Sequence, residues 1–163
     1  MLNYIHQLDY YEDECSKCDG LKKCRVPEKK KTEFFLHMIP PTTTHQEKQV
    51  SVKKGKPQFY EPEDLKAARA KLTAYLAQHI PEQKYTGALR VITKWCFPIT
   101  GKHKDGEWKT TKPDTHNMNK LPFDIMTDLK YWTDDAIVAS EIIEKFWANT
   151  PGIYISIEEL VSG

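Results

Sequence analysis

The sequence predicts a mixed α/β or α+β fold, in which a small sheet of about four strands carries two main helices. Two segments, 61–81 and about 115–130, have the apolar periodicity and end signals of helices. Four other segments have the apolar alternation of strands, which gives the order strand, helix, strand, helix, strand, strand. A chain of 163 residues is long enough to bury the core of one such domain.

The first strand is expected in TEFFLHMIP, residues 32–40. Phe34, Leu36 and Met38 would face one side of the sheet, because the side chains of a strand alternate between its two faces. The following segment, residues 41–60, holds prolines, threonines and the sequence KKGK. It is expected to be a polar, basic loop.

The first helix is the clearest element of the sequence. Pro62 suits its first turn, the acids beside this proline suit the positive end of the helix dipole, and Pro81 closes the helix. Apolar side chains recur along one face at helical spacing. This face consists of Leu65, Ala68, Leu72, Tyr75, Leu76 and His79.

The remaining elements are three strands and one helix. A polar turn region with a D-G signal, residues 101–113, precedes a helix from about Thr115 to Lys130, which Asp114 or Thr115 would cap. The strands are expected in GALRVITKWCFPI (87–99), AIVASEIIEKFWA (136–148) and PGIYISIEEL (151–160).

Residues 1–31 are expected to form an appendage. It holds Cys15, Cys18 and Cys24 in the pattern C-x2-C-x5-C. The first two thiolates are spaced to share one tetrahedral Zn²⁺, and Cys24 could be a third ligand. Free thiols in a polar segment and a redox role are the alternatives. The candidates for a fourth zinc ligand are His6, His37 and Cys96.

The net charge of +1 hides an uneven distribution along the chain. Residues 21–60 hold ten Lys or Arg against three Asp or Glu, and residues 111–163 hold nine acids against four bases. A basic region and an acidic region in one fold suit a protein that binds a polyanion with the first and a metal ion with the second. Ordinary surface variation is the alternative.

The chain is expected to be a soluble intracellular protein that does not enter a membrane. No segment approaches the roughly 18 apolar residues of a membrane helix. The first residues, MLNYIHQLDYYEDEC, have acids where a signal peptide has basic residues followed by an apolar run.

The segment KPDTHNMNKLPFDIMTDLKYWTDD, residues 112–135, gathers five aspartates, a histidine and two asparagines. Two or three carboxylates with open water positions are what Mg²⁺ prefers. Such an ion can generate a hydroxide nucleophile, and a nearby lysine can hold a phosphate oxygen. The segment therefore fits phosphodiester hydrolysis. The alternative is an Asp114 that only caps a helix, an exposed pair of Lys120 and Asp124, and a polar turn at residues 133–136.

The order P-D-x-x-N-x-x-K-x3-D-x9-DD-A-x-V, followed by a strand with Lys145, resembles the RusA family of Holliday junction resolvases. The spacing matches from Asp114 to Lys145, and the basic KKGKPQFYEPEDLKAA is similar to the early loop and first helix of that family. The resemblance covers roughly residues 32–160. It implies that residues 32–163 form a RusA-like nuclease domain, a small mixed α/β homodimer with two active sites.

The resemblance also implies the activity and the site. The activity is Mg²⁺-dependent paired nicking of opposed strands at a DNA four-way junction, and two-fold symmetry of the dimer would match that of the junction. Asp114 and Asp135 match metal-binding carboxylates, and Lys120 matches the catalytic lysine. Supporting positions around them are Asn117, Asp124 and Asp134.

His116 departs from the family pattern, which commonly has an aspartate at this position. A neutral imidazole can ligate a metal, but it suits Mn²⁺ or Zn²⁺ better than Mg²⁺. Alternatively, His116 is a general acid or base. If the change disables catalysis, the chain would be a junction-binding protein that does not cut.

The candidates for DNA contact are basic residues, because lysines on loops can follow phosphates without reading sequence. Phe59, Tyr60 and Trp108 could stack on bases or act as wedges, with packing at the rim of the core as the alternative. The basic candidates are Lys48, Lys53, Lys54, Lys56, Lys66, Arg69, Lys102, His103 and Lys104.

Three functions therefore remain open from the sequence. The first is an endonuclease for branched DNA, encoded by a phage or prophage. The second is a catalytically silent protein that binds junctions through the same dimer. The third is an interaction module whose appendage recruits a replication or recombination protein.

Overall fold

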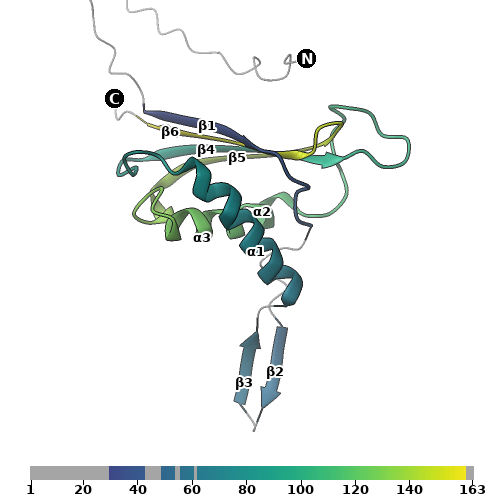
Figure 1. Cartoon of the computed structure of the whole chain (residues 1–163), viewed down its shortest axis with the longest axis horizontal. Coiled ribbons are helices and arrows are strands. Elements are labelled where there is room, and N and C mark those ends of the chain that lie inside the picture. Colours follow the sequence, from purple (N-terminus) through teal and green to yellow (C-terminus); the bar gives the residue numbers. More distant parts are fainter. Residues whose placement is uncertain (1–29, 43–48, 54–55, 61, 161–163) are drawn as a thin grey trace, which may run out of the picture.

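The computed structural model of the chain describes residues 30–42, 49–53, 56–60 and 62–160 (Figure 1). A four-stranded sheet has two main helices on one of its faces, and a two-stranded hairpin projects from the start of the first helix (Figure 1). The sheet holds β1 (Lys31–Leu36), β4 (Leu89–Pro98), β5 (Val138–Ala148) and β6 (Gly152–Glu159). The hairpin holds β2 (Gln49–Lys53) and β3 (Lys56–Tyr60). The helices are α1 (Glu63–Leu76), α2 (Thr115–Met118) and α3 (Lys120–Asp128).

The strand order of the sheet is β1-β6-β4-β5. β6 is antiparallel to both of its neighbours, whereas β4 and β5 are parallel. Parallel strands need a long crossover connection, and residues 99–137 with α2 and α3 supply it. The predicted sheet of about four strands with two main helices is confirmed.

The core lies between the sheet and the helices. Phe34, Leu36 and Met38 are buried, as the alternation of the first strand predicts. Ile153, Ile155 and Ile157 of β6 are also buried on the helix side. Both patterns are confirmed because each strand turns every second residue toward the helices.

α1 covers this core with the face that the sequence predicts. Leu65, Leu72 and Leu76 are fully buried, and Ala68 and Tyr75 pack against the same cluster. A short 3-10 turn, Ala77–His79, continues the helix, and the His79 ring stacks on Phe34 with 4.5 Å between centroids. Helix and turn end before Pro81, as expected.

The segment expected to be a basic loop contains the hairpin β2–β3 instead. The backbone pairing runs from Gln49 opposite Tyr60 to Lys53 opposite Lys56. The alternation of Val50 and Val52 with polar residues is a strand pattern, and the glycine between the two strands favours a tight turn. The prediction missed this pattern because the prolines and lysines dominate the composition.

The second helix is not continuous, which corrects the prediction of one helix from Thr115 to Lys130. It breaks at Asn119 into α2 and α3. Pro122 explains part of the break, because proline fits the first turn of α3 but would clash inside an uninterrupted helix. Asp114 occupies the capping position of α2 without making a side-chain capping hydrogen bond.

α3 ends in a tight turn at Lys130, whose φ is 67°. The amide of Lys130 donates to the Thr127 carbonyl at 3.1 Å, and the amide of Tyr131 donates to the Met126 carbonyl at 3.0 Å. These two bonds form a Schellman motif, which usually has glycine at the left-handed position. None of the helices in the described part of the chain is long and apolar enough to cross a membrane.

Replacing Lys130 by glycine is expected to raise the free energy of unfolding by about 1 kcal/mol, because glycine adopts a positive φ without the strain of a Cβ atom. Urea unfolding followed by circular dichroism measures the change. The control is Asp128→Gly, at the last residue of α3, which should lower the free energy of unfolding by up to about 1 kcal/mol. Equal losses in both variants would contradict the role of Lys130 in the turn.

Candidate active site

The segment before α2 is held along the outer edge of β5. Gly106 donates its amide to the Trp147 carbonyl at 2.9 Å, and Trp147 donates to the Glu107 carbonyl at 2.8 Å. The amide of Lys109 donates to the Lys145 carbonyl at 3.0 Å. These bonds cover the outer backbone edge of β5 near its end, at Lys145–Trp147, in the segment that leads to Asp114.

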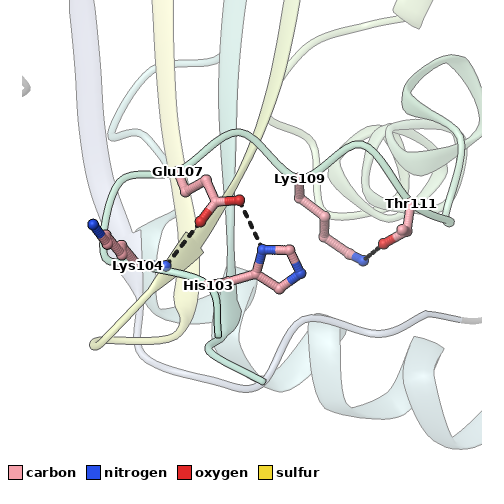
Figure 2. Close-up of polar contacts among 5 residues, drawn as sticks. All are labelled: His103, Lys104, Glu107, Lys109 and Thr111. Carbon is pink, nitrogen blue, oxygen red and sulfur yellow. Dashed lines mark hydrogen bonds and ion pairs between the residues drawn. The ribbon is translucent and has the colours of Figure 1, made fainter. Parts of the chain in front are cut away.

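Side chains fix the same segment (Figure 2). Glu107 contacts the His103 ring, with 2.7 Å between Oε1 and Nδ1, and accepts the backbone amide of Lys104 at 2.9 Å. The hydrogen bond with His103 is the main reason that the pKa of Glu107 is lowered. The His103 ring also stacks on Trp147, with 4.6 Å between centroids.

Two lysines contact the segment that precedes α2. Lys109 is buried, with its ammonium 4.2 Å from the centre of the Trp147 ring and hydrogen-bonded to the Thr111 hydroxyl (Figure 2). Burial, and then the nearby charge of Lys145, lower the pKa of Lys109. The Lys145 ammonium donates to the carbonyls of Thr111 at 2.7 Å and Pro113 at 2.6 Å.

Asn119 fixes the break between α2 and α3. Its Oδ1 accepts from the Thr93 hydroxyl at 2.9 Å and from the indole N–H of Trp95 at 3.1 Å. Its Nδ2 donates to Glu141 Oε1 at 2.8 Å. The side chain is 2% exposed, so a buried amide links the helix break to β4 and β5.

The residues predicted to carry catalysis are exposed around this anchored break. Asp114 precedes α2, His116 lies within it, and Lys120 is the first residue of α3. Asn117 is 6% exposed, on the inner side of α2, and lines a small hollow with Leu72 and Trp95. Asp124 is half-buried in α3.

Asp134 and Asp135 lie before β5, which begins at Val138 and not at residue 136 as predicted, because a 3-10 turn, Asp135–Ile137, precedes the strand. Asp134 Oδ1 accepts the amide of Ala136 at 2.8 Å and so caps this turn. Asp135 is exposed in the turn itself.

The described residues contain no group of three or more His, Cys, Asp or Glu side chains placed to hold a metal ion. Asp114, His116 and Asp135 are therefore not assembled as a three-ligand centre in this chain. The donor chemistry still fits Mg²⁺ or Mn²⁺, because Mg²⁺ is commonly bound by one or two carboxylates together with substrate phosphates. Exposed carboxylates at Asp114 and Asp135 can accept such an ion.

The predicted DNA-contact residues fall on the hairpin, on α1 and in the region after β4. Lys53 and Lys56 pair at the tip of the hairpin β2–β3, which also includes Phe59 and Tyr60. Lys102 and Lys104 are exposed in the turn after β4, and the Lys104 side chain points away from Glu107 (Figure 2).

Two basic candidates and one aromatic candidate have defined surroundings. Lys66 on α1 pairs with Glu63 at 2.7 Å, and Arg69 is half-buried on the same helix. Trp108 is 60% exposed and packs on Phe146, with 4.4 Å between centroids. Several calls lie outside the described residues: Lys48, Lys54 and the cysteines Cys15, Cys18 and Cys24 of the appendage.

Residues 38–158 match the family model described as Endodeoxyribonuclease RusA. The chain belongs to the RusA family. It is also 33% identical over 106 residues to a protein of Lactococcus phage r1t named crossover junction endodeoxyribonuclease rusA. That alignment covers 64% of this chain and 78% of the phage protein. The family assignment predicted from the spacing of the acidic segment is confirmed, and it makes the chain a nuclease.

Three residues around the predicted site were given no role by the sequence analysis. Asn119 looked like one polar residue on a helix, and Lys109 like one more lysine of a basic turn. Lys145 was noted only as the end of a motif. A lysine on a strand position that alternation turns toward the helices was the one available signal for Lys145.

Replacing Asn119 by aspartate is expected to lower the free energy of unfolding by about 1–3 kcal/mol. The introduced carboxylate cannot donate a hydrogen bond to Glu141 and is repelled by the negative charge of Glu141. Urea unfolding followed by tryptophan fluorescence measures the loss. Adding Glu141→Gln supplies a donor for the introduced carboxylate, so the double variant should recover part of the loss. Independent, additive losses from the two substitutions would contradict this contact.

Proposed function

We propose that this chain resolves Holliday junctions and related branched DNA by metal-dependent, paired symmetric nicking. The observation that carries the proposal is the exposed set Asp114, His116 and Lys120, held around an anchored helix break in a chain of the RusA family. The name of the phage relative, a crossover junction endodeoxyribonuclease, supports four-way DNA as the substrate.

The chemistry follows from the residue types. Asp114 and Asp135 are hard oxygen donors that would hold Mg²⁺ or Mn²⁺ together with oxygens of the DNA phosphate, and His116 would be a further ligand. When bound, the ion supplies Lewis-acid stabilisation of the phosphate and lowers the pKa of water. Lys120, exposed at the start of α3, would hold a non-bridging phosphate oxygen as its charge develops.

The basic hairpin tip and the turn after β4 would bind the arms of the junction. Lys53, Lys56, Lys102 and Lys104 contribute four positive charges from two parts of the molecule. Contacts of this kind go to phosphates, so they position the duplex and carry no sequence information. The affinity should accordingly fall steeply as salt concentration rises.

A second copy of this chain would cut the opposed strand, so we propose a homodimer. The sheet face away from the helices offers a surface for it (Figure 1). Two ion pairs lie on this face, Lys31–Glu33 at 3.0 Å and Lys94–Glu144 at 3.5 Å. Because the face holds both positive and negative side chains, it would be electrostatically complementary to the same face of a second copy. The apolar side chains that alternation places there are Phe35, Ile92, Cys96, Ile142, Phe146 and Tyr154.

The replacement Asp114→Asn is expected to lower cleavage of a synthetic four-way junction at least about a hundredfold, because an amide is a far weaker ligand for the ion. Gel analysis of nicked products in Mg²⁺ and in Mn²⁺ measures the loss. Asp128→Asn, an exposed carboxylate at the end of α3, is the control and should cut normally.

A plasmid with an extruded cruciform tests the pairing of the two nicks in the same assay. Two sites acting in one complex release linear plasmid, whereas a single site leaves nicked circles. Tight junction binding without cleavage in either metal would instead support a junction-binding protein that does not cut.

Replacing His116 by aspartate is expected to lower the Mg²⁺ concentration needed for half-maximal cleavage by about tenfold, because it adds a hard, negatively charged ligand. Titration of the cleavage rate with Mg²⁺ and with Mn²⁺ measures the shift, and His116→Ala separates the added charge from loss of the ring. Loss of activity of His116→Asp in both metals would refute this role of the position.

A further inference from the structure

The Lys145 ammonium is hydrogen-bonded to the backbone that precedes Asp114. Its ammonium lies 2.7 Å from the Thr111 carbonyl oxygen and 2.6 Å from the Pro113 carbonyl oxygen. Both distances are typical of charge-assisted hydrogen bonds, which are stronger than neutral ones. No carboxylate in the described part of the chain forms an ion pair with Lys145. The attraction of this ammonium is thus directed at two carbonyl oxygens.

The Pro113 carbonyl is covalently tied to Asp114. The six atoms of a peptide unit lie in one plane, from the Cα atom of one residue to the Cα atom of the next. Holding the Pro113 oxygen therefore holds the amide and the Cα atom of Asp114. The Asp114 side chain makes no capping hydrogen bond to its own helix, so the preceding backbone determines the position of the Cα atom from which the carboxylate extends.

The other side of α2 is held independently. The amide of Asn117 donates to the Asp114 carbonyl at 3.1 Å, and Asn119 connects the end of α2 to β4 and β5. Lys145 and Asn119 thus fix the short helix at both ends. A four-residue helix has little stability of its own, so these external contacts determine its orientation.

We propose that Lys145 is a positioning residue, which clamps the backbone at Thr111 and Pro113 and so holds Asp114 ready to bind the divalent ion. This inference rests on the proposed function, because it assigns Lys145 a role only if Asp114 is a metal ligand. Lys145 itself does not touch the ion.

The experiment measures Mn²⁺ binding to the full chain without DNA, from the electron paramagnetic resonance signal of free Mn²⁺. Lys145→Met removes both hydrogen bonds and should weaken Mn²⁺ binding about tenfold, the lower end of the effect seen for residues that orient metal ligands. Lys145→Arg can still donate to both carbonyls and should stay within about threefold of wild type. Lys71→Met, exposed on α1, removes a similar charge from a different element and should change nothing.

Wild-type Mn²⁺ affinity in Lys145→Met would overturn the proposal. Equal weakening in Lys145→Arg, or in Lys71→Met, would overturn the proposal too, since the clamp would then not be the cause. If urea titrations show that Lys145→Met is not folded, Lys145→Gln replaces it, because the glutamine side-chain amide can donate to one carbonyl. Lys145→Gln should weaken binding by an intermediate factor, and an unchanged affinity would overturn the clamp.

Asp114→Asn separates this inference from the proposed function. If that variant keeps both Mn²⁺ binding and junction cleavage, Asp114 is not the ligand and the proposed site fails. If Asp114→Asn loses both while Lys145→Met keeps Mn²⁺ binding, the site stands and the clamp alone is refuted. Junction binding in metal-free buffer should differ by less than about threefold between Lys145→Met and wild type.

Discussion

The buried amide of Asn119 is the contact on which the rest of this site depends. The Asn119 side chain accepts from the buried Thr93 and Trp95 and donates to Glu141. The Asn119 amide would otherwise be left without these partners in a low-dielectric interior. The break between α2 and α3 is therefore tied to the sheet and not to the local preferences of the helix. His116 and Lys120 flank this break, so the sheet sets the direction in which each of them faces solvent.

β5 is an edge strand that gives the site its second anchor. An exposed edge is a ready template for pairing with other chains, and residues 106–109 cover this edge along Lys145–Trp147. The same cover brings Thr111 and Pro113 within reach of Lys145 on the helix side of the strand. Protecting the edge and positioning the start of α2 are thus two results of one arrangement, and neither depends on the hairpin at the far end of α1.

The parts of this structure that follow from local periodicity were predictable from the sequence. The buried stripe of α1 and the alternation of β1 and β6 each repeat a simple pattern that burial enforces. The helix break at Asn119 was not predictable in this way, because its cause lies in Thr93, Trp95 and Glu141, which are distant in sequence. The family motif located Asp114, but the contacts that hold Asp114 involve carbonyl oxygens, and a sequence pattern does not reveal their partners.

In the proposed site, a divalent ion would be held by the carboxylates of Asp114 and Asp135. Two carboxylates in close contact repel each other, and a bound divalent cation would offset that repulsion. In that proposed site, a histidine at position 116 in place of an aspartate would lower the negative charge, which would reduce repulsion but also weaken attraction for Mg²⁺. A site with less charge depends more on ligands that are already in position, since each ligand that must be ordered on binding reduces affinity. Rigid support of α2 by Asn119 and Lys145 is therefore most valuable in a chain that has histidine at position 116.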